Sequence, residues 1–143
     1  MILIACVDDD GGMMFNKRRQ SRDSAVTKRI ADISAGGVLW VSGYTEELFA
    51  DLGCSNIRVA DDPALCAGPG EFCFLEETSP GEFADRAEKL VIFRWNRRYP
   101  SDVKFDIDPD EKETVDGYRW KKESSADFAG TSHEKITEEI YTK

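Results

Sequence analysis

The chain is poor in histidine and in paired cysteines, and each shortage excludes a class of site. His133 is the only histidine among 143 residues, so one chain cannot build a site from several histidines. A triad of serine, histidine and aspartate would have to use this residue. The four cysteines show no C-x-x-C spacing, which favours buried free thiols in a reducing compartment over disulfides or a metal site.

Long apolar runs and positive charge are also scarce, which argues against membrane and nucleic-acid partners. The longest apolar run, residues 1–7, is far below the roughly 20 residues of a membrane-crossing helix and lacks the flanks of a secretory signal. We therefore expect no membrane segment and a cytoplasmic location. Nineteen Lys and Arg against 28 Asp and Glu residues give a net charge of -9, which opposes general binding to nucleic acid.

What the chain does contain is an alternation of short apolar runs with helical patterns, which is typical of an α/β fold with a mostly parallel sheet. Apolar residues spaced four and three apart predict a helix from Asp23 to Gly36. A capping-box spacing with proline at the first helical position predicts another helix over 79–88. The predicted strands are 1–7, 38–41, 56–60, 71–75 and 90–95, with a short helix over 45–49 and a loop over 61–70.

The last part of the chain follows a different pattern. Residues 118–123 and 134–141 alternate apolar with polar side chains and are separated by a loop that contains Gly and Ser. This pattern predicts an antiparallel hairpin at one edge of the sheet. No repeat or low-complexity tract interrupts the chain, so we predict one domain over residues 1–143, with helices on both faces of the sheet.

Four segments share their order and spacing with a known fold. They are the opening ILIACVD with Gly12 after it, the run LWVSGYTEELF over 39–49, the stretch 87–108 that contains AEKLVIF and YPSDVKFDID, and residues 133–143. Together these segments resemble the dihydrofolate reductase family along nearly the whole chain. The resemblance implies a mixed sheet of the dihydrofolate reductase type. It also implies NADPH as cofactor and the reduction of dihydrofolate, or of a related pterin or pyrimidine, as activity.

The chain departs from this family where the substrate would bind. Counted without gaps between Gly12 and Thr45, the position of the family's substrate-binding carboxylate is Val26. Valine can neither hydrogen-bond a pterin ring nor support proton delivery to it. The remaining catalytic candidate is Asp23, one helical turn earlier, and it would require a shift in the loop.

The cofactor side departs as well. Gly43 and Tyr44 stand where the family has a basic residue that meets the phosphate of NADPH, and Glu76 and Glu77 stand where a glycine pair lets the backbone approach the cofactor. Carboxylates at that place would repel a pyrophosphate. Residues 60–71 are too few for a further βαβ unit of the adenosine-binding wall. We therefore expect no NADPH cofactor and no reductase activity.

The interpretation that follows is a pseudoenzyme whose degenerate cleft binds a small molecule or a protein partner, as a monomer or a homodimer. Arginines near the cleft could hold an oxyanion, because guanidinium groups bind such groups bidentately, or they could form a solvated face. They lie in the segment that replaces the substrate-closing loop of the resembling enzymes. The candidate ligand-binding residues are Cys6, Asp8, Met13, Met14, Val26, Tyr44 and Glu76, and the candidate anion-binding residues are Arg18, Arg19 and Arg22.

Acidic residues at the ends of predicted strands are also compatible with a second kind of enzyme. Asp8, Asp10 and Glu76 could form an oxygen-ligand cluster for Mg²⁺ or Ca²⁺, which would suit a metal-dependent phosphoryl hydrolase. The alternative is that acidic turn residues are solvated or bond the local backbone. His133 has two similar interpretations, a group that titrates near neutrality or a hydrogen-bonded structural residue. Trp95 is expected in the core.

Overall fold

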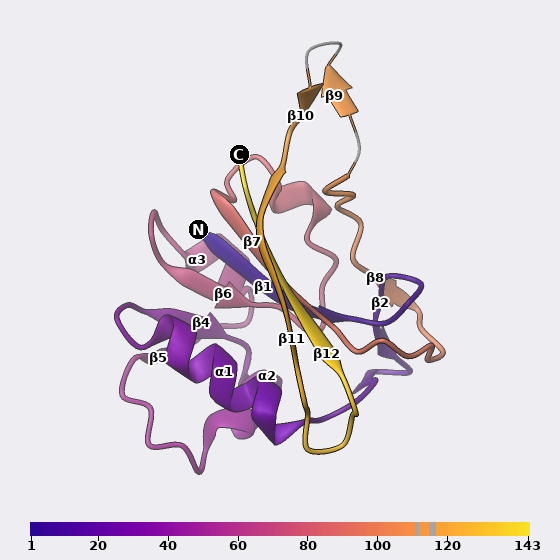
Figure 1. The fold of residues 1–143 in the computed structure, drawn as a ribbon. Coiled ribbons are helices and arrows are strands. Elements are labelled where there is room, and N and C mark those ends of the chain that lie inside the picture. Colours follow the sequence, from indigo (N-terminus) through magenta and orange to yellow (C-terminus); the bar gives the residue numbers. More distant parts are fainter. Residues whose placement is uncertain (111, 115–116) are drawn as a thin grey trace.

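The computed structural model describes residues 1–110, 112–114 and 117–143, which are built around a seven-stranded sheet of order β11-β12-β7-β1-β6-β4-β5 (Figure 1). Strands β7, β1, β6, β4 and β5 run parallel to one another, whereas β12 pairs antiparallel with both β7 and β11. The expected mixed sheet with a C-terminal antiparallel hairpin is therefore confirmed. The strands are β1 (Ile2–Val7), β4 (Leu39–Val41), β5 (Ile57–Val59), β6 (Phe72–Phe74), β7 (Lys89–Arg94), β11 (Lys121–Phe128) and β12 (Ile136–Thr142).

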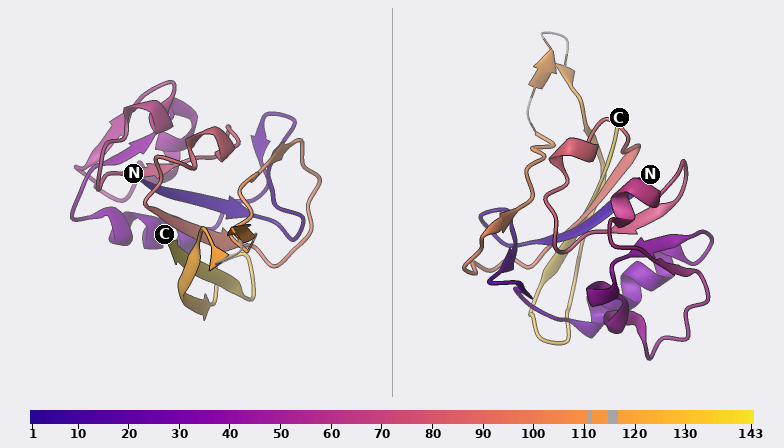
Figure 2. Two further views of the ribbon diagram at one scale, coloured as in Figure 1. Left: turned by 90° about the horizontal axis from the view of Figure 1, so that it is seen from above. Right: turned by 180° about the vertical axis from the view of Figure 1, so that it is seen from behind.

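Each face of the sheet carries its own apolar core, because successive side chains of a strand point to opposite faces. In β1, Leu3 and Ala5 enter one core and Ile4 enters the other. The first core is covered by α3 (Pro63–Cys66) and the 3₁₀ turn η2 (Gly81–Phe83), and the second by α1 (Ser24–Ser34) and the 3₁₀ turn η1 (Glu47–Phe49). Helical segments thus lie on both faces, as predicted (Figure 2).

Helix α1 forms where the apolar spacing predicted it. Asp23 is its N-cap and accepts a hydrogen bond from the N–H of Ala25 at 3.0 Å, which satisfies one of the free donors of the first turn. Val26 and Ile30 lie on the buried face. The helix ends at Ser34, shortly before Gly36. The Ser34 Oγ donates a hydrogen bond to the carbonyl of Ile30 at 2.9 Å.

A small three-stranded sheet, which the apolar pattern did not predict, follows β1. It contains β2 (Gly12–Phe15), β3 (Arg18–Arg19) and β8 (Val103–Lys104). Asn16 and Lys17 connect β2 to β3 with φ of 51° and 62°, the left-handed values that a tight two-residue hairpin turn requires. The apolar run in this segment is only the three residues 13–15, and its position depends on pairing with the distant β8. The hairpin carries Arg19 toward the main sheet.

Four predicted elements differ from the structure. The helix expected over 45–49 is divided into α2 (Gly43–Glu46), capped by Ser42, and η1. The helix expected over 79–88 is only the turn η2, because the Gly81 N–H is taken by the Asp106 carboxylate at 2.6 Å and no side chain caps the segment. The expected loop 61–70 contains α3. The first hairpin strand, expected over 118–123, is β11, and β9 (Lys112–Thr114) pairs with β10 (Gly117–Tyr118) before it.

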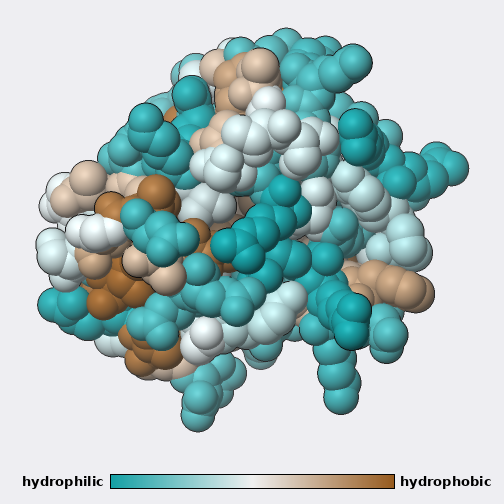
Figure 3. Space-filling model, turned by 90° about the horizontal axis from the view of Figure 1, so that it is seen from below, coloured by the Kyte–Doolittle hydropathy of each residue, from teal (hydrophilic) through white to brown (hydrophobic). Residues whose placement is uncertain are grey.

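The outer edge of the parallel part is the short strand β5. The segment between β5 and β6 contains only the four-residue α3, so no further strand extends the sheet there. Viewed from below, hydrophobic residues gather toward the side of the molecule that holds α1 and β5 (Figure 3), and Leu52 and Val59 are exposed. Among the described residues, no helix has the length and apolar character needed to cross a membrane.

Candidate functional site

The carboxyl ends of β1, β6 and β4 meet at one edge of the sheet, because the three strands are parallel and adjacent. Ligands of open α/β sheets bind outside such ends. Asp8 follows β1, Ser42 follows β4 and Glu76 follows β6. Asp8 and Glu76, two of the predicted site residues, therefore lie at this edge of the sheet, and their individual contacts decide what each can do.

Asp8 braces the loops around it. Its Oδ1 accepts from the N–H groups of Asp10 at 2.9 Å and Gly12 at 2.7 Å, and its Oδ2 accepts from the N–H of Tyr99 at 2.9 Å and from Gln20 at 3.3 Å. Burial raises the pKa of Asp8, but the three backbone donors outweigh it and leave the pKa below its usual range. The carboxylate is thus ionised and fully engaged within the chain.

Arg19 and Glu76 form a two-bond ion pair across the site. The Nε of Arg19 donates to Glu76 Oε2 at 2.9 Å and Nη2 donates to Oε1 at 3.1 Å, while Nη1 reaches Glu47 at 2.9 Å. The side chains of Arg19 and Glu76 are only 13% and 9% exposed. Burial alone would lower the pKa of Arg19, but the two glutamates hold it above its usual value. Arg19 was predicted to bind an external anion, and Glu76 and Glu47 occupy its guanidinium instead.

The loop after β4 is bonded to the same carboxylates. Tyr44 lies under the Arg19 guanidinium, 4.2 Å from ring centroid to Cζ, and its hydroxyl accepts the Arg19 backbone N–H at 2.9 Å. Thr45 donates to Glu76 at 2.9 Å, and Ser42 donates to Glu77. The loops that end β4 and β6 are therefore linked directly to each other.

Asp23, the predicted weak catalytic candidate, lies at the base of α1 and is 2% exposed. Its Oδ1 accepts from Ala25 and from the N–H and hydroxyl of Thr131, and its Oδ2 accepts from the N–H and hydroxyl of Ser132. Burial raises the pKa of Asp23, but these donors and His133 together hold it well below its usual range. The side chain caps α1 and fastens the loop before β12.

His133 joins this cluster from the other end of the chain. Its Nδ1 lies 3.1 Å from Asp23 Oδ2, and its Nε2 lies 3.2 Å from Ser21 Oγ and 3.0 Å from the Tyr99 hydroxyl. The ring stacks on Trp95, with centroids 4.7 Å apart, and His133 is 5% exposed. The sequence drew attention to His133 as the sole histidine but contained no signal that Ser21 and Tyr99 would contact it.

A small cavity, here called the inner cavity, lies between the two clusters, and Cys6, Val26 and Glu76, three of the residues predicted to bind a ligand, are in its wall. Its free volume is about 20 Å³, enough for about one water molecule. Burial, then Glu76 and Asp23, raise the pKa of the Cys6 thiol well above its ordinary value, so the thiol stays neutral. The cavity is lined by Cys6, Ser21, Arg22, Asp23, Val26, Thr27, Ile30, Leu48, Phe74, Glu76 and Trp95.

Other predicted residues lie elsewhere. Met13 packs in the core on the opposite face of the sheet, and Met14 is buried in β2 without lining the inner cavity. Arg18 is exposed and Asp10 pairs with Arg98 at 3.1 Å, whereas Arg22 is exposed but also lines the inner cavity. In the described part of the chain, no three His, Cys, Asp or Glu side chains are grouped to hold a metal ion, so Asp8, Asp10 and Glu76 do not form the cluster considered from the sequence.

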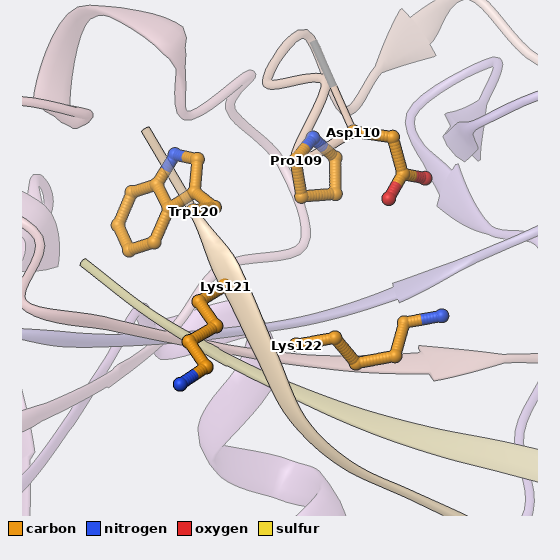
Figure 4. Close-up of a pocket in the computed structure, with 5 residues that line it drawn as sticks. All are labelled: Pro109, Asp110, Trp120, Lys121 and Lys122. Atoms are coloured by element: carbon orange, nitrogen blue, oxygen red, sulfur yellow. The ribbon is translucent and has the colours of Figure 1, made fainter. Parts of the chain in front are cut away.

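A larger cavity of about 450 Å³ opens between the loop at Pro109 and the start of β11 (Figure 4). It lies at the amino end of β7, since Lys122 pairs with Tyr141 and Tyr141 with Leu90. Lys122 extends on the same side as Asp110, whereas Lys121 points away. The Lys122 ammonium is 2.9 Å from Glu139, so an internal carboxylate already neutralises it.

Comparisons with known proteins bear on the fold. No model of a protein family matches the chain, and a search of curated proteins finds no match. Among solved structures, a dihydrofolate reductase from Enterococcus faecalis, complexed with NADP(H) and RAB-propyl, superposes with a TM-score of 0.65 at 11% identity. The superposition covers 99% of this chain and 94% of the enzyme. The chain therefore has the dihydrofolate reductase fold, as its four segments predicted, in a highly divergent sequence.

Proposed function

We propose that this chain does not reduce dihydrofolate with NADPH, and that it binds a small polar molecule in the inner cavity at the strand ends. The observation that carries the proposal is the buried ion pair between Arg19 and Glu76. The pair lies where the resemblance puts glycines beside a cofactor, and its two charges are satisfied by each other.

The bonds around this pair make the position a poor fit for NADPH. A dinucleotide would have to separate Arg19 from Glu76, and removal of one partner from a buried ion pair costs about 3–5 kcal/mol. It would also meet Glu77 beside Glu76, two carboxylates that repel a pyrophosphate. Thr45 and Ser42 also hydrogen-bond these two glutamates, so side chains stand after β6 where glycines would let a ligand approach the backbone.

The size and walls of the inner cavity limit the ligand. Drug-sized ligands occupy roughly 300–1,000 Å³, whereas the free volume here is about 20 Å³. A bicyclic pterin therefore does not enter the cavity in this conformation. Apolar walls from Val26, Leu48 and Phe74 surround the few polar groups of Cys6, Ser21 and Glu76, an arrangement that suits a small molecule with one polar end.

The loss of reductase function is tested with NADPH and dihydrofolate. We expect no decrease in the absorbance of NADPH when both are mixed with the protein, and no quenching of tryptophan fluorescence by NADPH alone. NADPH binding with turnover would refute this half of the proposal.

The binding half is tested by ligand-observed NMR with a library of polar fragments of only a few non-hydrogen atoms, which match the small size of the inner cavity. Cys6→Leu adds side-chain volume at the inner cavity and should abolish the binding of any fragment that occupies it. Cys66→Leu is the matched control, because Cys66 is exposed on α3 and should leave binding unchanged. Fragments that bind both variants equally, or no fragment at all, would contradict the proposal.

A further inference from the structure

We propose that Ser21, His133 and Asp23 form an acyl-transfer centre that hydrolyses small esters. The three side chains make a continuous chain of contacts, with 3.2 Å between Ser21 Oγ and His133 Nε2 and 3.1 Å between His133 Nδ1 and Asp23 Oδ2. A hydroxyl, an imidazole and a carboxylate in this order are the parts of an activated serine nucleophile. The inference rests on the proposed function only in that the ester's acyl group would occupy the inner cavity.

The contacts of Asp23 determine which ring nitrogen of His133 carries the proton. An ionised carboxylate only accepts hydrogen bonds, and Asp23 is held ionised by its donors from Thr131 and Ser132. His133 Nδ1 must therefore donate to Asp23 Oδ2. In the neutral ring, Nε2 is then the unprotonated nitrogen, and it faces the Ser21 hydroxyl. This is the tautomer that a general base for serine requires.

The surroundings hold the imidazole in place. Trp95 stacks on one side of the ring at an interplanar angle of 22°, and Asp23 is fixed by four donors from residues 131 and 132. A base that is held in its reactive orientation before the substrate binds lowers the cost of reaching the transition state. Arg22 lines the inner cavity beside Ser21 and is the cation available to a developing oxyanion.

Ser21 and His133 lie at the boundary between two cavities, which define the class of substrate. Ser21 lines the inner cavity of about 20 Å³, and His133 lines an outer cavity of about 370 Å³ together with Arg97 and Lys135. Trp95 lines both. The inner cavity, with room for about one water molecule, restricts the acyl group to the smallest size, whereas the outer cavity accepts a larger leaving group. Two cations against the one carboxylate of Glu134 favour a leaving group that carries negative charge.

The reaction is balanced by the chain's own groups and water. Ser21 Oγ attacks the ester carbonyl while its proton moves to His133 Nε2, and the bond to the leaving alcohol breaks as Nε2 returns that proton to the alcohol oxygen. Water then attacks the acyl-serine by the same route, which releases the acid and restores Ser21. No oxidant, reductant or metal is required.

Tyr99 restrains this centre in the resting protein. Its hydroxyl lies 3.0 Å from the same Nε2 that would accept the Ser21 proton, and one unprotonated nitrogen accepts one good hydrogen bond at a time. Tyr99→Phe removes the competing donor and keeps the ring. We expect this variant to react faster than the wild type, a result that a purely structural histidine would not produce.

The test uses p-nitrophenyl acetate as the probe. The full chain is incubated with the ester, p-nitrophenolate release is followed, and the acetylated residue is located by mass spectrometry of peptides. We expect acetylation at Ser21 in the wild type and none at that position in Ser21→Ala, which should also lose the release. Ser125→Ala, at an exposed position of β11, is the matched control and should react like the wild type. Acetylation elsewhere without acetylation of Ser21 would overturn the proposal.

The variant Asp23→Asn tests whether Asp23 orients the His133 ring for catalysis or only stabilises the fold. Asparagine remains a good N-cap, but its amide can donate to Nδ1 and place the proton on Nε2. We expect release to fall about 10³–10⁴-fold, as for the loss of the carboxylate from a serine triad, while circular dichroism stays unchanged. Equal rates in the wild type and this variant would refute the centre. Fragment binding blocked by Cys6→Leu can persist whatever the esterase result, so the two proposals fail separately.

Discussion

The two polar clusters beside the inner cavity differ in how completely their groups are paired. In the cluster of Arg19 and Glu76, both charges and the hydroxyl of Thr45 are satisfied by each other. In the cluster of Asp23 and His133, the carboxylate is satisfied but Nε2 is shared by two hydroxyls, Ser21 and Tyr99. A saturated cluster contributes stability and resists a ligand, whereas a shared acceptor leaves one group able to exchange partners. The first end of the cleft is therefore the structural one, and the second is the end where chemistry is possible.

The largest loss of stability is expected when the ion pair between Arg19 and Glu76 is broken. Glu76→Ala leaves the largely buried Arg19 with the exposed Glu47 as its remaining carboxylate partner, so the free energy of unfolding should fall by about 3 kcal/mol. Urea unfolding measures the loss. Glu77→Ala, which removes the neighbouring exposed carboxylate, should cost under about 1 kcal/mol. Equal losses in the two variants would show that the ion pair is no more important than a surface contact.

A side chain added at Gly130 should disturb the cluster of Asp23 and His133. A Cβ at Gly130 would collide with the Asp23 carboxylate and would lie 2.7 Å from Ile136 Cδ1. Gly130→Ala should therefore destabilise the protein by about 1–3 kcal/mol. Thermal or urea unfolding would detect the change. Gly36→Ala is the control, because a Cβ there meets nothing within 4 Å, and it should leave stability unchanged or slightly higher.

The stabilising contribution of the Asp23 carboxylate should depend on pH. The pKa of Asp23 is lower in the folded than in the unfolded chain, so its stabilising contribution is complete above the ordinary aspartate pKa of about 3.9 and is lost as the pH falls below it. The wild type should exceed Asp23→Asn in unfolding free energy by about 1–2 kcal/mol near neutral pH, and the difference should narrow below about pH 4. Urea titrations at several pH values test this, and a constant difference would contradict it.

The smallest change in stability is expected for Arg18, which precedes the ion-paired Arg19 in the chain. Arg18 precedes Arg19 in β3 but is exposed, so Arg18→Ala should change the free energy of unfolding by less than about 0.5 kcal/mol. Arg19→Ala should cost several times more, because Glu76 then loses its partner. If both variants behaved alike in urea unfolding, the contrast between a solvated and a buried arginine in one hairpin would be wrong.

The elements that the sequence predicted well are those with a dense local pattern. The strands at 1–7 and 90–95 and the helix after Asp23 were recognised because each buries a run or a stripe of apolar residues. The expectation that Trp95 is buried is confirmed, at 5% exposure. The helix expected over 79–88 was wrong because a local capping pattern was overridden by the distant Asp106 carboxylate.

The candidate site was less predictable, since its residues pair across long separations. Local sequence identified Arg19, Asp23, Glu76 and His133 as notable, each for its own charge or rarity. It could not show that Arg19 binds Glu76, 57 residues away, in place of an anion, or that His133 lies on Asp23, 110 residues away. The binding of a ligand, the partner and the oligomeric state stay predictions.

The amino-acid sequence by itself determined the main strands and the helix after Asp23, because apolar runs and stripes are local, and the resemblance of its four segments indicated the dihydrofolate reductase type of fold. Only the tertiary structure decided which charges neutralise one another and which side chains contact each ring nitrogen of His133. Those outcomes depend on contacts of about 3 Å between segments that the sheet brings together, and hydrogen bonds of that length leave no trace in local sequence.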